Sequence, residues 1–169
     1  MPERCRLLFE QIRASQSVCV HIRRGDYVSN VKAALIHGTC SIEYYQRASA
    51  SLATTLLSPH CYVFSDDPNW VRNSFRLTFP TTVVDVNTGM DASWDLFLMS
   101  QCKHFVIANS TFSWWAAWLG DEVNKRVIAP RNWFHDDSKN TKDLLPAEWE
   151  LIWSLLLPLA PFGHRYRRY

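Results

Sequence analysis

Two adjacent arginines directly follow an apolar run in the segment SVCVHIRRGDYV, residues 17–28. The guanidinium groups of Arg23 and Arg24 are suited to bidentate binding of phosphate oxygens. Asp26 is placed to orient one of the arginines, and His21 precedes them on the same run. A surface pair bridged to acids is the alternative for the arginines, and a core histidine is the alternative for His21. Two cations directly after a buried strand favour an anion site.

A second group of polar residues ends the apolar run HFVIANS at residues 104–110. Asn109, Ser110 and Thr111 are followed at once by a helical segment that contains Ser113. Hydroxyls and free backbone N–H groups at a helix N-terminus bind anions. Together with the arginine pair, this set is suited to a diphosphate.

Glycine-rich phosphate loops are absent from the sequence, which has five glycines and neither GxGxxG nor GxxxxGK[ST]. The carboxylates of Asp66 and Asp67 follow another apolar run and could hold a metal ion. Alternatively, Asp67 could cap a helix that starts at Pro68, where the missing N–H costs nothing. We favour the cap, so we predict no metal site.

Short runs rich in β-branched residues alternate with helical segments along the chain. Strands are predicted at 17–23, 61–66, 81–86, 104–110 and 126–130. Helices are predicted at 41–57 with Ser41 as N-cap, at 66–75, at 91–102, and at 111–120 with Gly120 as C-cap. This alternation predicts an α/β fold with a Rossmann-like, doubly wound, mostly parallel sheet. Ligands bind beyond the carboxyl ends of the strands in such sheets, where the polar groups described above stand.

The composition is that of an ordinary globular domain. A chain of 169 residues can form one full core, and its formal net charge of +2 argues against nucleic-acid binding. The five cysteines have no CxxC pair and no metal spacing, so a reducing compartment is the simpler interpretation. Eight tryptophans are many for this length, and we expect most of them in the core.

Two segments near the end of the sequence are expected to lie outside the sheet. Residues 131–146 are polar and rich in Asn and Asp, which predicts a long surface loop. The apolar run at 153–163 is too short to span a membrane and is interrupted by Pro158 and Pro161. We interpret it as a terminal packing element.

Four segments, in this order, resemble the α-1,2-fucosyltransferase family, glycosyltransferase family 11. They are HIRRGDYV, FSDDPNW, DLFLMSQCKHFVIANSTFSWWAAWLG and VIAPRNWF, and the resemblance covers about residues 17–152. The HxRRxD box is shared more widely, with α-1,6- and protein O-fucosyltransferases. The segment NSTFSWWAAWL indicates the α-1,2 branch.

This resemblance implies a GT-B-like fold of two Rossmann-type domains, of which the C-terminal one holds GDP-fucose. It also implies an inverting transfer of L-fucose from GDP-fucose to the 2-hydroxyl of a galactoside, without a metal or other cofactor. Asp95 and the Lys103–His104 pair fall in the segment that related enzymes place near the guanosine. The implied donor-binding residues are His21, Arg23, Arg24, Asp95, Asn109, Ser110, Thr111 and Ser113, and the implied catalytic residues are Arg23, Arg24 and Asp26.

The sequence departs from the family pattern in one respect, because the GGLGNQ-like segment of the acceptor-facing N-terminal domain does not occur here. We therefore expect the chain to correspond to the C-terminal donor half, either as a fragment or as a module whose partner supplies the rest. Residues 1–16 would be an N-terminal helix or interdomain remnant, 17–157 the donor domain and 158–169 a tail.

The general base would then lie in the missing domain. A nucleotide-sugar-binding or glycan-binding module without turnover is the alternative function. A bacterial-like protein would be cytoplasmic or membrane-associated, and a truncated eukaryotic one would belong to the Golgi membrane. The glycosylation sequon NST at 109–111 lies where phosphate contact is expected, so we expect it to be unoccupied.

Overall fold

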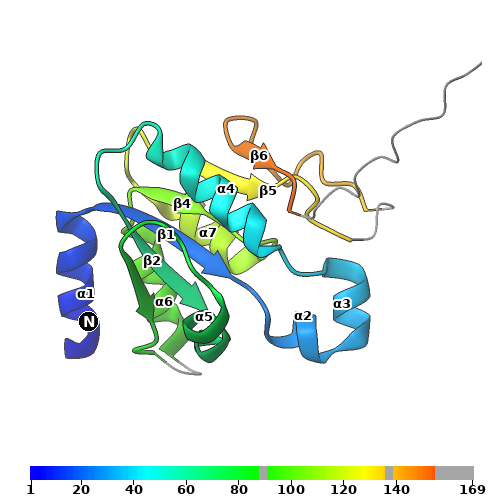
Figure 1. Cartoon of the computed structure of the whole chain (residues 1–169), viewed down its shortest axis with the longest axis horizontal. Helices are drawn as coiled ribbons and strands as arrows, with labels where there is room; N and C mark the ends of the chain where they lie inside the picture. Colours follow the sequence, from blue (N-terminus) through cyan, green and yellow to red (C-terminus); the bar gives the residue numbers. More distant parts are fainter. Residues whose placement is uncertain (88–90, 136–138, 155–169) are drawn as a thin grey trace, which may run out of the picture.

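A parallel β-sheet forms the centre of the computed structural model, which describes residues 1–87, 91–135 and 139–154. The six strands have the order β3-β2-β1-β4-β5-β6, and each adjacent pair is parallel (Figure 1). This is the strand order of doubly wound Rossmann folds, so the predicted α/β fold is confirmed. The strands are β1 (Gln16–Ile22), β2 (Pro59–Ser65), β3 (Thr81–Val84), β4 (His104–Val106), β5 (Val127–Pro130) and β6 (Glu150–Ile152).

Helices cover both faces of the sheet. One face packs against α1 (Glu3–Ala14), α6 (Ala92–Ser100) and α7 (Thr111–Leu119), and the other packs against α4 (Ile42–Ala53) and α5 (Pro68–Ser74). Two short helices, α2 (Gly25–Ser29) and α3 (Val31–His37), lie beyond the carboxyl end of β1 (Figure 1). These two helices were not predicted from the sequence.

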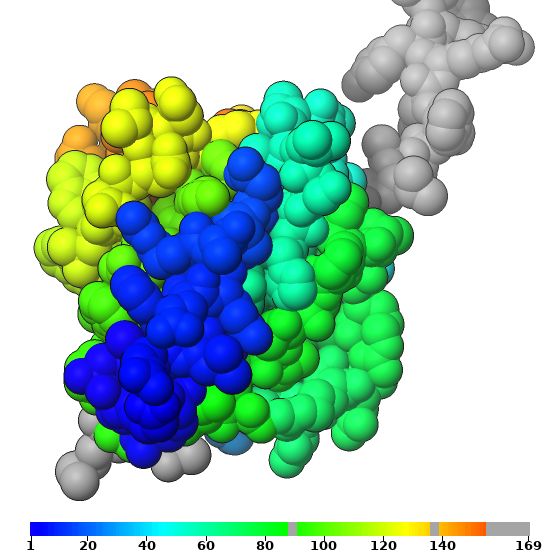
Figure 2. Space-filling model, turned by 90° about the vertical axis from the view of Figure 1, so that its left-hand side faces the viewer, coloured from blue at the N-terminus to red at the C-terminus, as the bar shows by residue number. Residues whose placement is uncertain are grey.

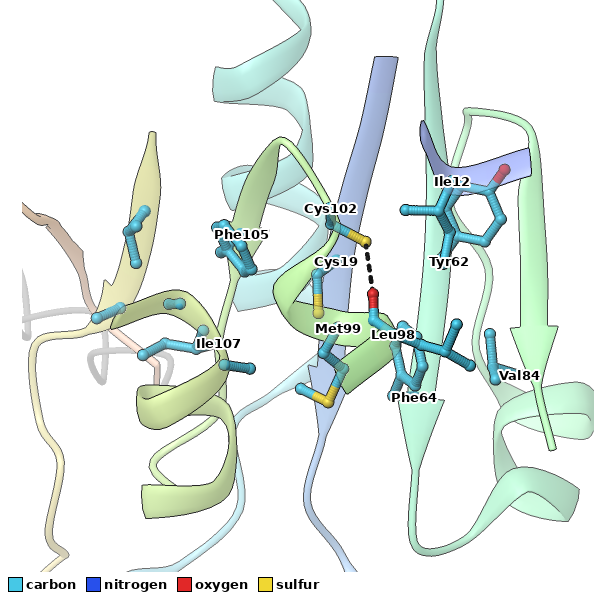
Figure 3. Close-up of a cluster of buried hydrophobic side chains, with 14 of the residues drawn as sticks. Ile12, Cys19, Tyr62, Phe64, Val84, Leu98, Met99, Cys102, Phe105 and Ile107 are labelled. Atoms are coloured by element: carbon cyan, nitrogen blue, oxygen red, sulfur yellow. Dashed lines mark hydrogen bonds between the residues drawn. The ribbon is translucent and has the colours of Figure 1, made fainter. Parts of the chain in front are cut away.

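The strands are apolar on both faces because the sheet is covered on both sides. Cys19 of β1 enters the core under α6 and α7, whereas Val18 and Val20 enter the core under α4. Figure 3 shows the first core, where Leu98 of α6 lies beside Phe64 of β2. The apolar packing on both faces fixes the strand ends that carry the polar residues.

The helix α1 belongs to this same core. Its residues Cys5 and Ile12 are fully buried, and Ile12 lies near Tyr62 in Figure 3. Figure 2 shows α1 in blue along one side of the molecule, in direct contact with the rest of the chain. The proposed boundary between 1–16 and 17–157 stays a prediction, and the tail at 158–169 lies outside the described residues.

Two helix starts follow the predicted caps. The Ser41 hydroxyl accepts a hydrogen bond from the Tyr44 backbone N–H at 3.2 Å at the start of α4. Asp67 accepts from the Trp70 backbone N–H at 3.0 Å, and Pro68 is the first residue of α5. The interpretation of Asp67 as a helix cap is therefore confirmed.

The sheet differs from the predicted one at three places. The strand β6 was not predicted, since only three residues, Glu150–Ile152, pair with β5. The strand β3 ends at Val84, and β4 ends at Val106, four residues short of the predicted 104–110. One further bond, from the Ile107 N–H to the Ile128 carbonyl at 3.0 Å, follows β4 before the chain leaves the sheet.

The predicted loop at 131–146 contains no helix or strand in its described parts, 131–135 and 139–146. The packing element predicted at 153–163 lies outside the described residues from 155 onward. Among the helices in the described ranges, none has the length and apolar character that crossing a membrane requires.

Candidate functional site

A cavity of about 620 Å³ opens at the carboxyl ends of β1, β2 and β3. This volume is in the range of pockets that hold small organic ligands and cofactors. The position is the one where doubly wound folds bind their ligands. Its polar lining consists of His21, Arg23, Ser65, Asp66, Asn69, Arg72, Asp85, Asn87 and Asp95, and its aromatic lining consists of Phe64 and Phe112.

Arg23 is one of the two arginines that line the cavity. Its guanidinium lies between two carboxylates, with Nη2 at 2.6 Å from Asp26 Oδ1 and Nη1 at 3.0 Å from Asp66 Oδ2. The Arg23 Cζ also lies 5.4 Å from the ring centroid of Tyr27. One third of the side chain, 33%, is exposed. Arg23 is therefore oriented before any ligand arrives, and its contact with Asp26 is the one that the sequence suggested.

Arg24 lies in different surroundings and does not line the cavity. Its Cζ lies 3.8 Å above the ring of Trp70, and its Nε is 3.4 Å from Asp67 Oδ2. The sequence predicted that both arginines bind the donor and that Asp26 orients one of them. In the structure the cavity-lining arginine is itself the one held by Asp26, and Arg24 packs on α5 instead.

The turn between the strand and α2 depends on space at Gly25. A Cβ atom at this position would lie 2.5 Å from Asp66 Oδ2, closer than any real contact. The φ of Gly25 is not positive, so the backbone conformation there does not itself require a glycine. The glycine is therefore needed for the close approach of Asp66.

His21 is both a buried residue of β1 and a part of the cavity wall. It is 4% exposed, and its ring lies 5.8 Å from that of Phe112. Burial, followed by the charge of Arg23, lowers the pKa of His21 to about 3. Its Nδ1 is buried and has no hydrogen-bond partner among the described residues. The imidazole is therefore neutral near pH 7 and offers one donor and one acceptor.

Asp95 enters the cavity from the first turn of α6. Its carboxylate accepts a hydrogen bond from Asn87 Nδ2 at 2.7 Å. Burial raises the pKa of Asp95, and the bond from Asn87 opposes part of that rise. The Asn87 Oδ1 accepts from Arg4 Nε at 3.2 Å and from Cys5 Sγ at 3.3 Å, so α1 sets the direction of this amide.

Lys103 and His104 do not lie with Asp95. His104 is the first residue of β4, and both residues line a second depression, with Gln16 and Arg126. This depression is at the amino ends of the strands, the edge opposite the cavity. The structure therefore does not bring Lys103 and His104 together with Asp95, because β4 separates the two edges.

The Asn109 side chain holds loops together. Its Nδ2 donates to the carbonyl groups of His37 at 2.8 Å, Gly38 at 3.2 Å and Trp133 at 3.1 Å. The residue is 3% exposed. This amide nitrogen is the atom that would carry a glycan, so the sequon at 109–111 is blocked sterically.

The hydroxyl residues at the start of α7 do not line the cavity, whereas the neighbouring Phe112 does. Ser113 is fully buried, and its Oγ donates to the carbonyls of Ala108 and Ser110 at 3.4 and 3.2 Å. Ser110 is nearly buried at 8%, and Thr111 is exposed. Phosphate contact by Asn109, Ser110, Thr111 and Ser113 stays a prediction.

Apart from His21, Arg23 and Asp95, the residues that line the cavity were not among the predicted site residues. Asp85 lies near the end of the predicted strand at 81–86 and Asn87 directly follows it, so inspection of that strand end would have found them. Arg72 carries no such indication, because it lies on α5 and is paired with Asp85. Asp66 was predicted only as a possible metal ligand. Phe112 was not predicted, although it lies between the predicted residues Thr111 and Ser113.

The cavity combines cations with carboxylates and a neutral imidazole. Arg23 and Arg72 can meet an anion, while the carboxylates can accept hydrogen bonds from hydroxyl or amide donors of a ligand. No group of three or more His, Cys, Asp or Glu side chains is placed to hold a metal ion in the described part of the chain. A ligand with a phosphate group and a polar ring system suits this arrangement.

A doubly wound parallel sheet with an arginine-lined cavity at its carboxyl edge is an α/β architecture that binds ligands at this edge. Comparison with known proteins identifies the family. The model of "Glycosyl transferase family 11" matches residues 3–152, and the chain belongs to this family of glycosyltransferases. The resemblance noted from the four segments is thereby confirmed.

Three relatives illustrate the family. The chain is 41% identical to an alpha-1,2-colitosyltransferase of Escherichia coli, with 86% of this chain and 50% of the relative covered. It is 39% identical to the O-antigen biosynthesis glycosyltransferase WbnK of E. coli, covering 75% and 42%. It is 34% identical to the galactoside 2-alpha-L-fucosyltransferase Sec1 of Mus musculus, covering 82% and 39%. The chain thus spans half the length of these relatives or less.

Proposed function

We propose that this chain is the donor-binding half of a galactoside α-1,2-fucosyltransferase. The transfer would move L-fucose from GDP-fucose to the 2-hydroxyl of a galactoside with inversion. The observation that carries this proposal is the position of Arg23, which lines the cavity at the carboxyl edge of a family 11 sheet. Relatives named galactoside fucosyltransferases, such as the mouse protein, support the choice of donor and acceptor.

The chemistry of the transfer assigns a role to Arg23. Breaking the bond between fucose and phosphate builds an oxocarbenium-like centre and leaves negative charge on GDP. A fixed guanidinium that meets this charge stabilises the transition state without reorganisation. Asp26 and Asp66 hold the guanidinium at 2.6 and 3.0 Å, which supports such a preorganised role. We propose that no metal is needed.

The proposed nucleotide is a guanosine diphosphate. The guanine edge carries an N1–H and an N2 amino group as donors, and a carboxylate accepts from both. Asp95 is the candidate acceptor, because it lines the cavity and a hydrogen bond from Asn87 Nδ2 at 2.7 Å orients its carboxylate. The neutral His21 would lie near the nucleotide.

A galactoside acceptor and the general base require the part of a family 11 protein that this chain does not span. We propose that an N-terminal domain, on the same or another chain, supplies both. The 41% identity to a colitosyltransferase makes colitose the second candidate for the donor sugar. A nucleotide-sugar-binding module without turnover is the second candidate for the function, since the chain spans 50% of that relative.

Isothermal titration with GDP, GDP-fucose, a UDP-sugar and an ADP-sugar tests the proposal. We expect the two guanine ligands to bind more tightly than the other two. Equal affinity for all four, or no binding of GDP and GDP-fucose, would disprove the proposed donor. Product analysis with a galactoside then separates transfer from binding alone.

A further inference from the structure

We infer that Asp66 is a positioning residue that holds the arginine turn and directs Arg23 toward the diphosphate. The inference rests on the proposed function for the identity of the ligand. It concerns a residue that sequence analysis considered only as a metal ligand. Four observations carry it: one hydrogen bond and one ion pair of the same carboxylate, the space left by Gly25, and the shielding of Asp66.

The sheet places Asp66 beside the arginine turn. In the parallel pairing of β1 and β2, Ile22 lies opposite Ser65, so the residues that follow each strand emerge side by side. Asp66 is therefore next to the arginine turn although it lies 42 positions after Arg24 in the sequence. The sheet register, rather than the local sequence, brings the carboxylate to the turn.

Each oxygen of the Asp66 carboxylate has its own partner. Oδ1 accepts a hydrogen bond from the Arg24 backbone N–H at 2.9 Å, and Oδ2 lies 3.0 Å from Arg23 Nη1. The first contact fixes the path of the backbone, and the second fixes the direction of the side chain. Asp26 has only the second kind of contact with Arg23. Of these two carboxylates, Asp66 is therefore the one that links the backbone of the turn to the cation.

Gly25 leaves the space that this contact requires. A Cβ at residue 25 would lie 2.5 Å from Asp66 Oδ2. The side chain of Asp66 is 26% exposed and that of Asp26 is 52% exposed. The contact of Asp26 with Arg23 is the shorter one, at 2.6 Å, but the more shielded ion pair of Asp66 is screened less by solvent.

A positioning role and a simple counter-ion role predict opposite effects. A carboxylate in the same cavity repels a diphosphate, so removal of a mere counter-ion would tighten GDP binding. If Asp66 positions Arg23, its removal weakens GDP binding, because Arg23 must then be ordered at the cost of side-chain entropy. The sign of the change in affinity decides between the two roles.

Two substitutions separate the two contacts. Asp66→Asn keeps an oxygen that can accept from the Arg24 N–H, but it turns an amide NH₂ toward the guanidinium of Arg23. Asp66→Ala removes both contacts. Asp67→Asn is the matched control, because Asn is an equally good helix cap and Asp67 does not line the cavity.

Titration of GDP into these variants tests the inference. We expect about tenfold weaker binding for Asp66→Asn, a larger loss for Asp66→Ala, and less than about a threefold change for Asp67→Asn. In an Arg23→Ala background, Asp66→Asn should change the affinity by less than about threefold, because the residue acts through Arg23. The inference would be overturned if Asp66→Asn, in the chain that retains Arg23, bound GDP as tightly as or more tightly than the unchanged chain. An equal loss of GDP affinity with Arg23 and with Arg23→Ala would also overturn it.

A second measurement needs no nucleotide and keeps this inference separate from the proposed function. Hydrogen exchange of the Arg24 amide in the free protein should be at least about tenfold faster in Asp66→Ala than in the unchanged chain, whereas Asp66→Asn should keep most of the protection. Equal exchange rates of the Arg24 amide in all three proteins would refute the role of Asp66 in holding the turn. If the chain does not bind GDP but the Arg24 amide is still protected by Asp66, the proposed donor is refuted. The role of Asp66 in holding the turn is then still supported.

Discussion

Arg23 and Arg24 are neighbours in the chain, yet the first lines the cavity and the second stacks on the Trp70 ring at 3.8 Å. Successive residues at a strand end project in different directions, and nothing in the turn after β1 brings the two guanidinium groups together. The paired arginines are therefore two residues with two separate sets of contacts. The expected effects of their substitution differ accordingly.

Arg23→Ala should weaken GDP binding by about 1.5–3 kcal/mol, because it removes a hydrogen-bonding cation from the cavity. Arg24→Ala should leave most of the affinity intact and instead lower the free energy of unfolding by about 0.5–1 kcal/mol, through loss of the contact with Trp70. Titration calorimetry and urea unfolding measure the two effects. Arg23→Lys should recover only part of the affinity, since an ammonium lacks the guanidinium fork. Equal losses of affinity in both alanine variants would contradict this assignment.

Gly25→Ala should destabilise the protein by about 1–3 kcal/mol, because the new Cβ overlaps a carboxylate that is held in place. The same change in an Asp66→Ala background should be neutral or stabilising, since alanine is favoured over glycine at a helical position. Urea unfolding of the four proteins of this cycle gives the answer. A destabilisation of the same size in both backgrounds would show that backbone conformation, rather than Asp66, restricts residue 25.

Sequence patterns predicted the sheet well because its strands are buried on both faces and its helices carry local caps. The run at 17–23, the cap at Asp67 and the helix ending near Gly120 all depend on neighbouring residues alone. The strand β6 escaped prediction because three residues carry no periodicity. Tryptophans were predicted mostly for the core, yet Trp115, Trp118 and Trp153 are 51%, 51% and 45% exposed, which no local pattern indicates.

The site was predicted less completely, since its contacts cross the sheet. The position of Arg23 followed from the strand end, but the approach of Asp66 depends on the register between β1 and β2. Asn109 is an amide next to a helix start, and sequence does not reveal whether its donors face a ligand or loop carbonyls. In the structure they face the carbonyls of His37, Gly38 and Trp133.

The pKa of His21, lowered to about 3, predicts a dependence of stability on pH. Between pH 6.5 and 3 the unfolded chain binds a proton that the folded chain does not, so the free energy of unfolding falls as the pH falls. The contribution of His21 is about 1.4 kcal/mol per pH unit in this window and is absent above it. Urea unfolding of the unchanged chain and of His21→Gln at several pH values isolates it. Parallel curves for the two proteins would show that His21 titrates normally.

GDP binding should survive EDTA, and added Mg²⁺ or Mn²⁺ should change the affinity by less than about twofold. The physical reason is that Asp66 is occupied with the arginine turn and Asp67 caps α5. Calorimetry in EDTA, in Mg²⁺ and in Mn²⁺ provides the comparison. A metal-dependent gain of about tenfold or more would make Asp66 or Asp85 a ligand and refute the metal-free proposal.

The last prediction concerns selectivity for guanine over adenine in the bound nucleotide. Asp95→Asn should weaken GDP binding by about 1.5–3 kcal/mol, because the amide replaces one of two acceptor oxygens by a donor that faces the guanine donors. Binding of ADP, weak from the start, should change little, so the preference for guanine falls.

Arg4→Ala should produce a smaller loss in the same direction, since Asn87 then lacks one of the two donors that fix its amide. Arg6→Ala, a change of the same type on α1 whose guanidinium pairs with Glu3, is the matched control and should bind GDP normally. Competition titrations of GDP and ADP against all four proteins test this chain of contacts. An equal loss of both nucleotides in Asp95→Asn would show that Asp95 supports the cavity without selecting the base.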